Sequence, residues 1–280
     1  MTEPVAPAAA VVQGDVARAL EEDLGAIDLT AQLLPAWAEA SAQIIVREAA
    51  VLCGSDWAAA AFHSLDPELQ MHWHYRDGDR LVANCCVLDL CGKVRAIVSA
   101  ERTALNFLQT LSATATVARR YADAVVGTGT RVLDTRKTLP GLRAAQKYAV
   151  RCGGASNHRL GLYDAVLIKE NHIRAAGSIS AAISAARTIA GQRLVEIEVE
   201  TLAEFAQALA AAPDRMLLDD WSLVDMRQAV ADNAGRVALE ISGGVDLDRL
   251  QALAALGVDY LSVGALTKHL RAIDFSLRLL

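Results

Sequence analysis

The chain has 280 residues, of which 53% are hydrophobic and 21% charged, and its formal net charge is −6. This length allows one large or two modest domains, and the composition excludes a disordered or collagen-like chain. No apolar run approaches the roughly 20 residues that span a bilayer, and the acidic balance argues against general nucleic-acid binding. We therefore expect neither a membrane nor a nucleic acid as a partner.

The N-terminus and the cysteines indicate the compartment. The first residues lack the basic region of a secretion signal, and the five cysteines show no paired C-x-x-C spacing. Both features predict a cytoplasmic protein with reduced thiols. A zinc site formed by Cys85, Cys86 and Cys91 is an alternative, although their spacing fits no usual ligand pattern.

The first 126 residues predict a layer of helices and strands. Hydrophobic periodicity and turn residues predict these elements in chain order: a loose Ala/Pro-rich arm at 1–12, a helix at 14–24, a strand at 44–46, a helix at 57–62, a hairpin over 71–82 that turns at Asp77 and Gly78, a strand at 94–98, and a long helix at 99–126. Within the hairpin, His72 and His74 share one face. The sequence shows no third metal ligand beside them, so exposed sheet positions are the favoured interpretation.

From residue 131 onward, short apolar strands alternate with Ala-rich helices. The expected strands cover 132–133, 165–168, 195–199, 216–218, 237–241 and 260–263. Repeated strand–helix units predict a parallel sheet, either doubly wound or closed as a barrel. Six strands fall short of the eight strands of a complete (β/α)₈ barrel.

A polar or glycine group follows each of these strands. The groups are Arg136 with Lys137, Lys169, Glu198, Asp219, Ser242 with Gly243 and Gly244, and Gly264. In an α/β barrel the carboxyl ends of the strands meet at one rim, where such folds place their active sites. We therefore expect these groups to converge.

The order of these groups predicts the chemistry of the ligand. Residues 131–174 hold nine Lys or Arg against three acids, which indicates a local anion site. Glu198 and Asp219 can hold Mg²⁺, and the turn at 242–244 can present backbone N–H groups to a phosphate, with Asp246 capping the following helix. The pattern favours a sugar phosphate carrying a diphosphate, together with an acidic co-substrate.

The strand at 195–200 alternates strictly, so Glu196, Glu198 and Glu200 share one face. Three acids on one face are costly in a core, and that face must be wet, metal-bound or paired with cations. Pairing with Lys169 and Arg136 is the purely structural interpretation.

Several motifs resemble those of the quinolinate phosphoribosyltransferases, also called carboxylating nicotinate-nucleotide pyrophosphorylases. They are DTRKTLPG (134–141), GGASNHRLGL (153–162), LIKENH (167–172), ERTALN (101–106), EDLG (22–25) with DLT (28–30), and ISGG (241–244). The resemblance runs from about residue 16 to the C-terminus.

The resemblance implies an α/β fold with an N-terminal α/β sandwich domain at 1–110. An incomplete, six- to seven-stranded α/β barrel at 111–268 follows, and a segment at 269–280 packs back on the first domain. The implied reaction joins quinolinate to phosphoribosyl pyrophosphate with decarboxylation, giving nicotinate mononucleotide, pyrophosphate and CO₂ on the route to NAD. The implied assembly is a homodimer or larger, with shared active sites and with Mg²⁺ as cofactor.

The resemblance also implies residue roles. The pocket for the quinolinate carboxylates and the pyrophosphate is formed by Arg136, Lys137, His158, Arg159 and Lys169. Arg102 reaches in from the neighbouring subunit, and Glu198 and Asp219 lie near the ribose hydroxyls and Mg²⁺. The 5′-phosphate cradle consists of Ser242, Gly243, Gly244 and Gly264. Lys137, Lys169, Glu198 and Asp219 are the implied catalytic residues.

The sequence departs from the family pattern at Trp221, and three other functions are alternatives to the implied reaction. Trp221 stands in Asp-Asp-Trp where the family has Asp-Asn-Met, and its bulk is expected to narrow or reshape the pocket. The alternatives are a same-fold paralogue associated with molybdenum uptake, a Schiff-base aldolase using Lys169, and a non-catalytic sensor. The size of the basic set favours quinolinate, because a dianionic acid requires that many cations.

Overall fold

The computed structural model describes residues 5–280, and its chain divides into two compact units. The first unit contains the chain up to Arg120, together with Thr138–Gly154 and Leu266–Leu280. The second unit contains Tyr121–Lys137 and Ala155–Ala265.

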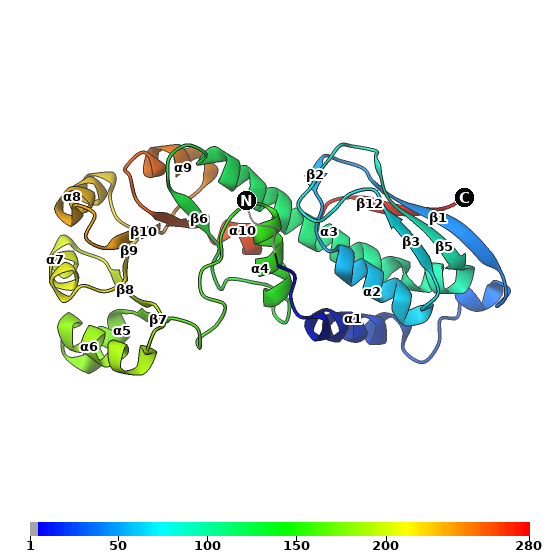
Figure 1. Ribbon diagram of the computed structural model, residues 1–280, viewed down its shortest axis with the longest axis horizontal. Coiled ribbons are helices and arrows are strands. Elements are labelled where there is room, and N and C mark those ends of the chain that lie inside the picture. The colour runs from blue at the N-terminus through cyan, green and yellow to red at the C-terminus, as the bar shows by residue number, and fades with distance from the viewer. Residues whose placement is uncertain (1–4) are drawn as a thin grey trace. The chain divides into compact units, whose positions relative to one another are not determined.

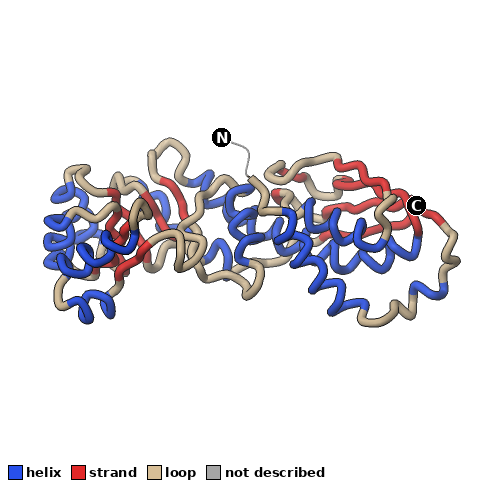
Figure 2. Tube along the Cα trace, turned by 60° about the horizontal axis from the view of Figure 1, so that its bottom comes forward, coloured by secondary structure: helices blue, strands red, loops and turns tan. Residues whose placement is uncertain are grey.

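The first unit contains an antiparallel sheet of four strands in the order β12-β1-β5-β3. Its strands are β1 (Glu39–Val46), β3 (Gln70–Trp73), β5 (Cys86–Lys93) and β12 (Phe275–Leu279), while β2 (Ala50–Val51) pairs separately with β4 (Arg80–Leu81). The helices are α1 (Ala9–Leu24), the 3₁₀ turn Ala31–Leu33, α2 (Ser55–Leu65), α3 (Val94–Ala124), α4 (Arg143–Cys152) and α10 (Ala265–Lys268), of which α3 and α10 cross a unit boundary. Helices α1, α2 and α3 lie along one side of the sheet (Figures 1 and 2).

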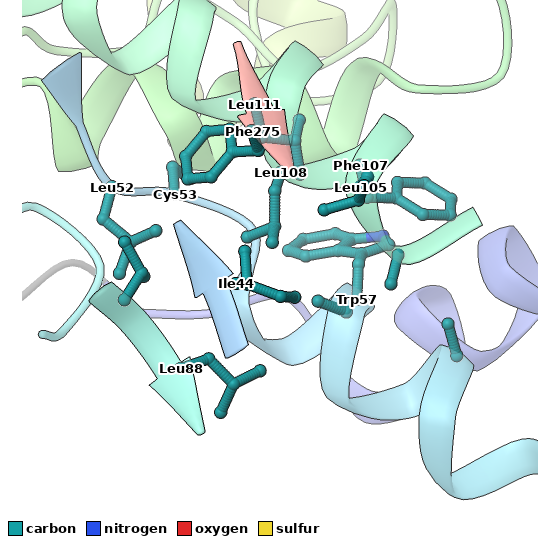
Figure 3. Close-up of a cluster of buried hydrophobic side chains, with 14 of the residues drawn as sticks. Ile44, Leu52, Cys53, Trp57, Leu88, Leu105, Phe107, Leu108, Leu111 and Phe275 are labelled. Carbon is teal, nitrogen blue, oxygen red and sulfur yellow. The ribbon is translucent and has the colours of Figure 1, made fainter. Parts of the chain in front are cut away.

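The core of the first unit fills the space between this sheet and its helices. Ile44 of β1, Trp57 of α2 and Leu108 of α3 are fully buried and pack together with Phe275 of β12 (Figure 3). The indole Nε1 of Trp57 donates to Asp15 Oδ2 at 3.1 Å, which satisfies its polar atom inside the core. The C-terminal strand β12 therefore packs into the same hydrophobic core as β1, α2 and α3.

The second unit is an open parallel sheet of six strands in the order β6-β11-β10-β9-β8-β7. The strands are β6 (Arg131–Leu133), β7 (Val166–Ile168), β8 (Val195–Val199), β9 (Arg215–Asp219), β10 (Ala238–Ser242) and β11 (Tyr260–Ser262). The helices are α5 (Glu170–Ala176), α6 (Ile179–Ala190), α7 (Leu202–Ala211), α8 (Leu223–Asn233) and α9 (Leu247–Ala254), and α5 to α8 lie outside strands β7 to β10 (Figure 1). The edge strands β6 and β7 do not pair, so the prediction of an incomplete α/β barrel is confirmed.

Polar side chains begin four of these helices. Ser178, Thr201, Ser222 and Asp246 each accept a hydrogen bond from the backbone N–H three residues later. These caps satisfy N–H groups that have no partner within the helix. The predicted cap at Asp246 is confirmed, with Asp246 Oδ1 2.9 Å from Arg249 N.

Two predicted elements of the first unit are wrong. The expected hairpin does not form, because β3 pairs with β5 and β4 pairs with β2. Asp77 instead accepts hydrogen bonds from Gly54 N and Ser55 N, at the start of α2. The expected strand at 94–98 is the first turn and a half of α3.

The N-terminal helix is longer than expected. Residues 1–4 of the predicted arm lie outside the described residues, and α1 already begins at Ala9 rather than at residue 14. Within residues 5–280, no helix combines the length and apolar content that a membrane crossing requires.

Candidate active site

The rim of the second unit encloses a cavity of about 390 Å³ at the carboxyl ends of its strands. Eight residues proposed from the sequence line it: Arg136, Lys137, His158, Arg159, Lys169, Glu198, Asp219 and Ser242. Thr135, Leu167, Leu217, Glu240 and Ser262 complete the lining. The structure thus brings together side chains that lie up to 127 positions apart in the chain, from Thr135 to Ser262.

Strand alternation places the acids of β8 at two depths. Glu198 reaches the cavity, whereas Glu196, two residues earlier on the same face, is completely buried. Lys169 follows β7, and its Nζ forms an ion pair with Glu198 Oε2. The predicted pairing of this acidic strand with Lys169 is therefore present. Glu196 has other partners.

A buried charge cluster, formed by His158, Glu196, Arg215 and Glu240, lies beneath the cavity. His158 Nε2 is 2.9 Å from Glu196 Oε2 and 3.6 Å from Glu240 Oε1. Arg215 Nη1 is 2.9 Å from Glu240 Oε2 and 3.9 Å from Glu196 Oε1. The Arg215 guanidinium also stacks 4.0 Å from the centre of the Tyr260 ring.

The cluster changes the protonation of two of its members. Burial raises the pKa of Glu240 to about 7, and the neighbouring Glu196 charge adds to this effect. Burial alone would lower the pKa of His158, but the carboxylates of Glu196 and Glu240 outweigh it and raise the pKa of that imidazole. The two carboxylates thus act on the ring through its Nε2 side.

The segment 156–159 is fixed to the end of β6 by Asp134. The buried Asp134 carboxylate accepts hydrogen bonds from Asn157 Nδ2 at 2.7 Å and from His158 N at 2.9 Å. Ser156 N donates to Val132 O at 2.8 Å, so this segment continues the sheet edge. Asp134 thereby determines where His158 and Arg159 lie.

The cationic side of the cavity lacks a full set of protein partners. Among the described residues, Arg136 Nε is buried without a hydrogen-bond partner. Burial and the positive charge of Arg136 lower the pKa of Arg159. Two guanidinium groups that repel each other, one with an unused buried donor, are suited to an anionic ligand.

Four predicted site residues, Gly243, Gly244, Gly264 and Arg102, are not among the residues that line this cavity. Gly243 and Gly244 follow β10 with φ of +82° and +56°, and Gly264 follows β11. A Cβ on Gly243 would lie 2.8 Å from Asp220 N, so only glycine fits that close approach. Arg102 is an exposed residue of α3 and belongs to the first unit.

Trp221 does not narrow the cavity as the sequence led us to expect. Its side chain is buried, its Nε1 donates to Val199 O at 2.9 Å, and its ring packs edge-on against Phe205 of α7. The left-handed backbone at Asp220 (φ +58°) precedes this turn away from the rim. Trp221 therefore contributes to packing beneath the loop and does not line the cavity.

Sequence reasoning missed the roles of Asp134, Arg215 and Glu240. A signal was present for Glu240, which precedes Ser242 by two residues and therefore faces the same side of its strand. Arg215 precedes Asp219 by four residues and shares its face in the same way. Asp134 opens the DTRKTLPG motif, but an acid at a strand end does not by itself reveal that it fixes the segment 156–159.

The two rim acids have the chemistry of a magnesium site. Glu198 and Asp219 both present carboxylates to the cavity. Mg²⁺ usually keeps several waters and binds through one or two carboxylates together with substrate phosphates. The residues present therefore fit a Mg²⁺ ion that arrives with a phosphorylated substrate.

Taken together, the open barrel and its cationic rim define an α/β-barrel enzyme that acts on anionic substrates. Two family models match the chain: "Quinolinate phosphoribosyl transferase, N-terminal domain" over residues 28–112 and "Quinolinate phosphoribosyl transferase, C-terminal domain" over residues 114–278. The chain belongs to the quinolinate phosphoribosyl transferase family, as its motifs predicted.

Individual relatives cover nearly the whole chain. The nicotinate-nucleotide pyrophosphorylase [carboxylating] of Mycobacterium leprae is 41% identical over 94% of this chain and 95% of its own. The nicotinate-nucleotide pyrophosphorylase from Francisella tularensis, whose structure has been solved, is 46% identical with a TM-score of 0.95, and the match covers 99% of this chain and 98% of that one. NadC from Streptococcus pyogenes is 38% identical with a TM-score of 0.94 and covers 99% of both chains. These comparisons give the molybdenum-associated alternative no support.

Proposed function

We propose that this protein transfers the phosphoribosyl group of phosphoribosyl pyrophosphate to quinolinate, with release of CO₂ and pyrophosphate and formation of nicotinate mononucleotide. The observation that carries the proposal is the cationic cavity in which Arg136 keeps an unpaired, buried donor. Family membership and the names of the relatives support the same reaction.

In the proposed mechanism the basic residues orient the substrates. Arg136, Arg159 and Lys137 bind the quinolinate carboxylates and the pyrophosphate, which holds the pyridine nitrogen toward the anomeric carbon. The N–C bond forms as the bond from that carbon to the pyrophosphate oxygen breaks. Positive charge develops on the ribose, and the carboxylates of Glu198 and Asp219 stabilise it.

Decarboxylation follows on the ribosylated ring. The ring nitrogen is now cationic, so the carboxylate beside it can leave as CO₂ while the electron pair remains on the ring carbon, which then takes a proton from solvent. Lys169, paired with Glu198, supplies positive charge at this side of the cavity. The cations must not stabilise the departing carboxylate too strongly, because uniform binding gives no rate enhancement.

Three finer features belong to the same proposal. Glu198 and Asp219, together with the pyrophosphate, would hold Mg²⁺, which would supply positive charge to neutralise the leaving group. The protein acts as a homodimer or larger assembly in which Arg102 reaches a neighbouring active site. It works in the cytoplasm, consistent with five cysteines that are all unpaired in the structure.

Release of labelled CO₂ tests the reaction directly. Purified protein is incubated with quinolinate labelled in the carboxyl group beside the ring nitrogen, with and without Mg²⁺ and phosphoribosyl pyrophosphate. We expect release only with both, and nicotinate mononucleotide in equal amount. A folded protein that binds both substrates and releases no CO₂ would contradict the proposal.

A further inference from the structure

The outer face of the antiparallel sheet in the first unit carries a cluster of three metal-ligand side chains, His74, Cys86 and Asp89. Their donor atoms all lie within 4.8 Å of one another. His74 Nε2 is 2.7 Å from Asp89 Oδ2, and Cys86 Sγ is 3.6 Å from Asp89 Oδ1. One nitrogen, one sulfur and one oxygen donor thus lie close enough together to bind one metal ion.

A β-bulge in β5 brings the thiol into this cluster. The register between β1 and β5 shifts at Ile44 and Ile45, which pair with Leu88 and Cys86. Val87 is therefore an extra residue, and both Val87 and Leu88 are fully buried. Without the bulge, Cys86 and Asp89 would face opposite sides of the sheet, since side chains alternate along a strand.

The surroundings orient the cluster and leave it open to solvent. Gln43 Nε2 donates to Asp89 Oδ1 at 2.9 Å, so the carboxylate is held by a neighbour on the next strand. The side chains of His74 and Asp89 keep 36% and 40% of their exposure, so an ion in solution can reach them. A ligand held by a second hydrogen bond is typical of metal sites in proteins.

We propose that His74, Cys86 and Asp89 form a zinc site with three protein ligands and one open position. Imidazole, thiolate and carboxylate are all ordinary zinc ligands, and this mixed set suits Zn²⁺ better than the oxygen-binding Mg²⁺ or Ca²⁺. Binding releases the thiol proton to solvent as sulfur coordinates the metal. The site is separate from the rim acids of the second unit, and the proposal does not rest on the proposed reaction.

The structure corrects the zinc site that the sequence offered as an alternative. Cys85, Cys86 and Cys91 form no shared group of donors among residues 5–280. Cys91 lies two residues beyond Asp89 and is exposed, opposite Ser41 on the neighbouring strand. Of these three cysteines, Cys86 alone lies beside His74, the histidine for which the sequence showed no third metal ligand.

Cobalt titration of the reduced, metal-free protein tests this site. Co²⁺ bound to a thiolate gives a charge-transfer absorption in the near ultraviolet, which the sulfur-free rim acids cannot produce. We expect this band in the wild-type protein, its displacement by Zn²⁺, and its loss in Cys86→Ser. Cys91→Ser, a change of a thiol in the same strand outside the cluster, should retain it.

Two further variants decide where the metal binds. Asp89 is held by Gln43, so Gln43→Leu should weaken Zn²⁺ binding by about tenfold. Cys152→Ala removes one thiol of the buried group Cys53, Asp77 and Cys152, and should leave the band intact. No band in the wild-type protein, a band that survives Cys86→Ser, or a band lost in Cys152→Ala would each overturn the proposal. The CO₂-release assay on Cys86→Ser checks the fold separately.

Discussion

His158 Nε2 lies 2.9 Å from a carboxylate oxygen of Glu196, a residue that is completely buried beneath the active-site cavity. The other ring nitrogen, Nδ1, accepts a hydrogen bond from Arg159 N at 2.7 Å. The imidazole is thus held at both nitrogens, and the backbone of Arg159 is tied to the same ring. A buried acid below the rim therefore helps to position two residues of the cationic pocket.

Replacing Glu196 by glutamine tests this relationship. Gln keeps the size of the side chain but removes the negative charge, so the pKa of His158 should fall. NMR titration of the His158 ring measures this change. Glu198→Gln, on the same face of β8 but paired with Lys169, serves as the matched control and should leave the pKa of His158 in place. Equal pKa values in wild-type and Glu196→Gln proteins would show that Glu196 does not control the ring.

Glu240 makes the stability of the fold depend on pH. Its pKa is raised from 4.5 to about 7, so the folded state retains a proton that the unfolded chain has already lost. This contribution to stability is fully present below pH 4.5 and is lost as the pH rises to about 7. The free energy of unfolding that is lost over this range is about 3 kcal/mol. The raised pKa of His158 acts in the same direction, through its own folded pKa.

Denaturant unfolding of wild-type protein and Glu240→Gln over this pH range measures the effect. The free energy of unfolding of the wild-type protein should fall more steeply between pH 4.5 and 7 than that of the variant, which has no proton to lose at this position. Parallel curves would mean that Glu240 titrates normally in the folded protein.

The two halves of the chain differ in how far their sequence determines them. In the second unit, repeated strands with polar ends predicted both the six-stranded sheet and the cavity residues, because strand ends in a parallel sheet must converge. In the first unit, the run at 94–98 was ambiguous between helix and strand, since a short apolar segment fits either. Ile97, Ala100 and Ala104, all fully buried, show the helical spacing that decides it.

Contacts between distant residues account for the other errors. Asp77 and Gly78 form a turn, as their types suggest, but the strands beside it pair with other partners. Trp221 lies two residues beyond the rim acid Asp219, and yet it packs against Phe205. In both cases, tertiary packing chose between conformations that the local sequence permits equally.

Lys169 is predicted to be essential for catalysis. Lys169→Ala removes the cation that faces Glu198 in the cavity, and kcat/KM should fall by about 10²- to 10³-fold, as for the loss of a preorganised charge. Arg174→Ala, an exposed cation on the helix that follows Lys169, is the matched control and should retain wild-type activity. Steady-state CO₂ release compares the two variants. Comparable activities would remove Lys169 from the catalytic residues.

Gly243 should tolerate alanine poorly. Gly243 and Gly257 share a φ of +82°, but a Cβ on Gly257 meets nothing within 4 Å, whereas a Cβ on Gly243 would lie 2.8 Å from Asp220 N. Gly257→Ala should therefore cost only about 1–2 kcal/mol of backbone strain. Gly243→Ala should cost about 1–3 kcal/mol more through overpacking. Thermal unfolding of both variants measures the difference, and equal losses would show that the loop at Asp220 moves aside freely.

The proposed sharing of active sites between subunits predicts complementation. Arg102→Ala and Lys169→Ala should each be inactive alone, because each variant damages every site. In a mixed dimer one site carries both changes and the other carries neither. Random mixing should then restore about a quarter of wild-type activity, since half of the dimers are mixed and each has one intact site of two. If each variant is inactive alone and mixed dimers verified by differential tagging also remain inactive, Arg102 acts within its own subunit.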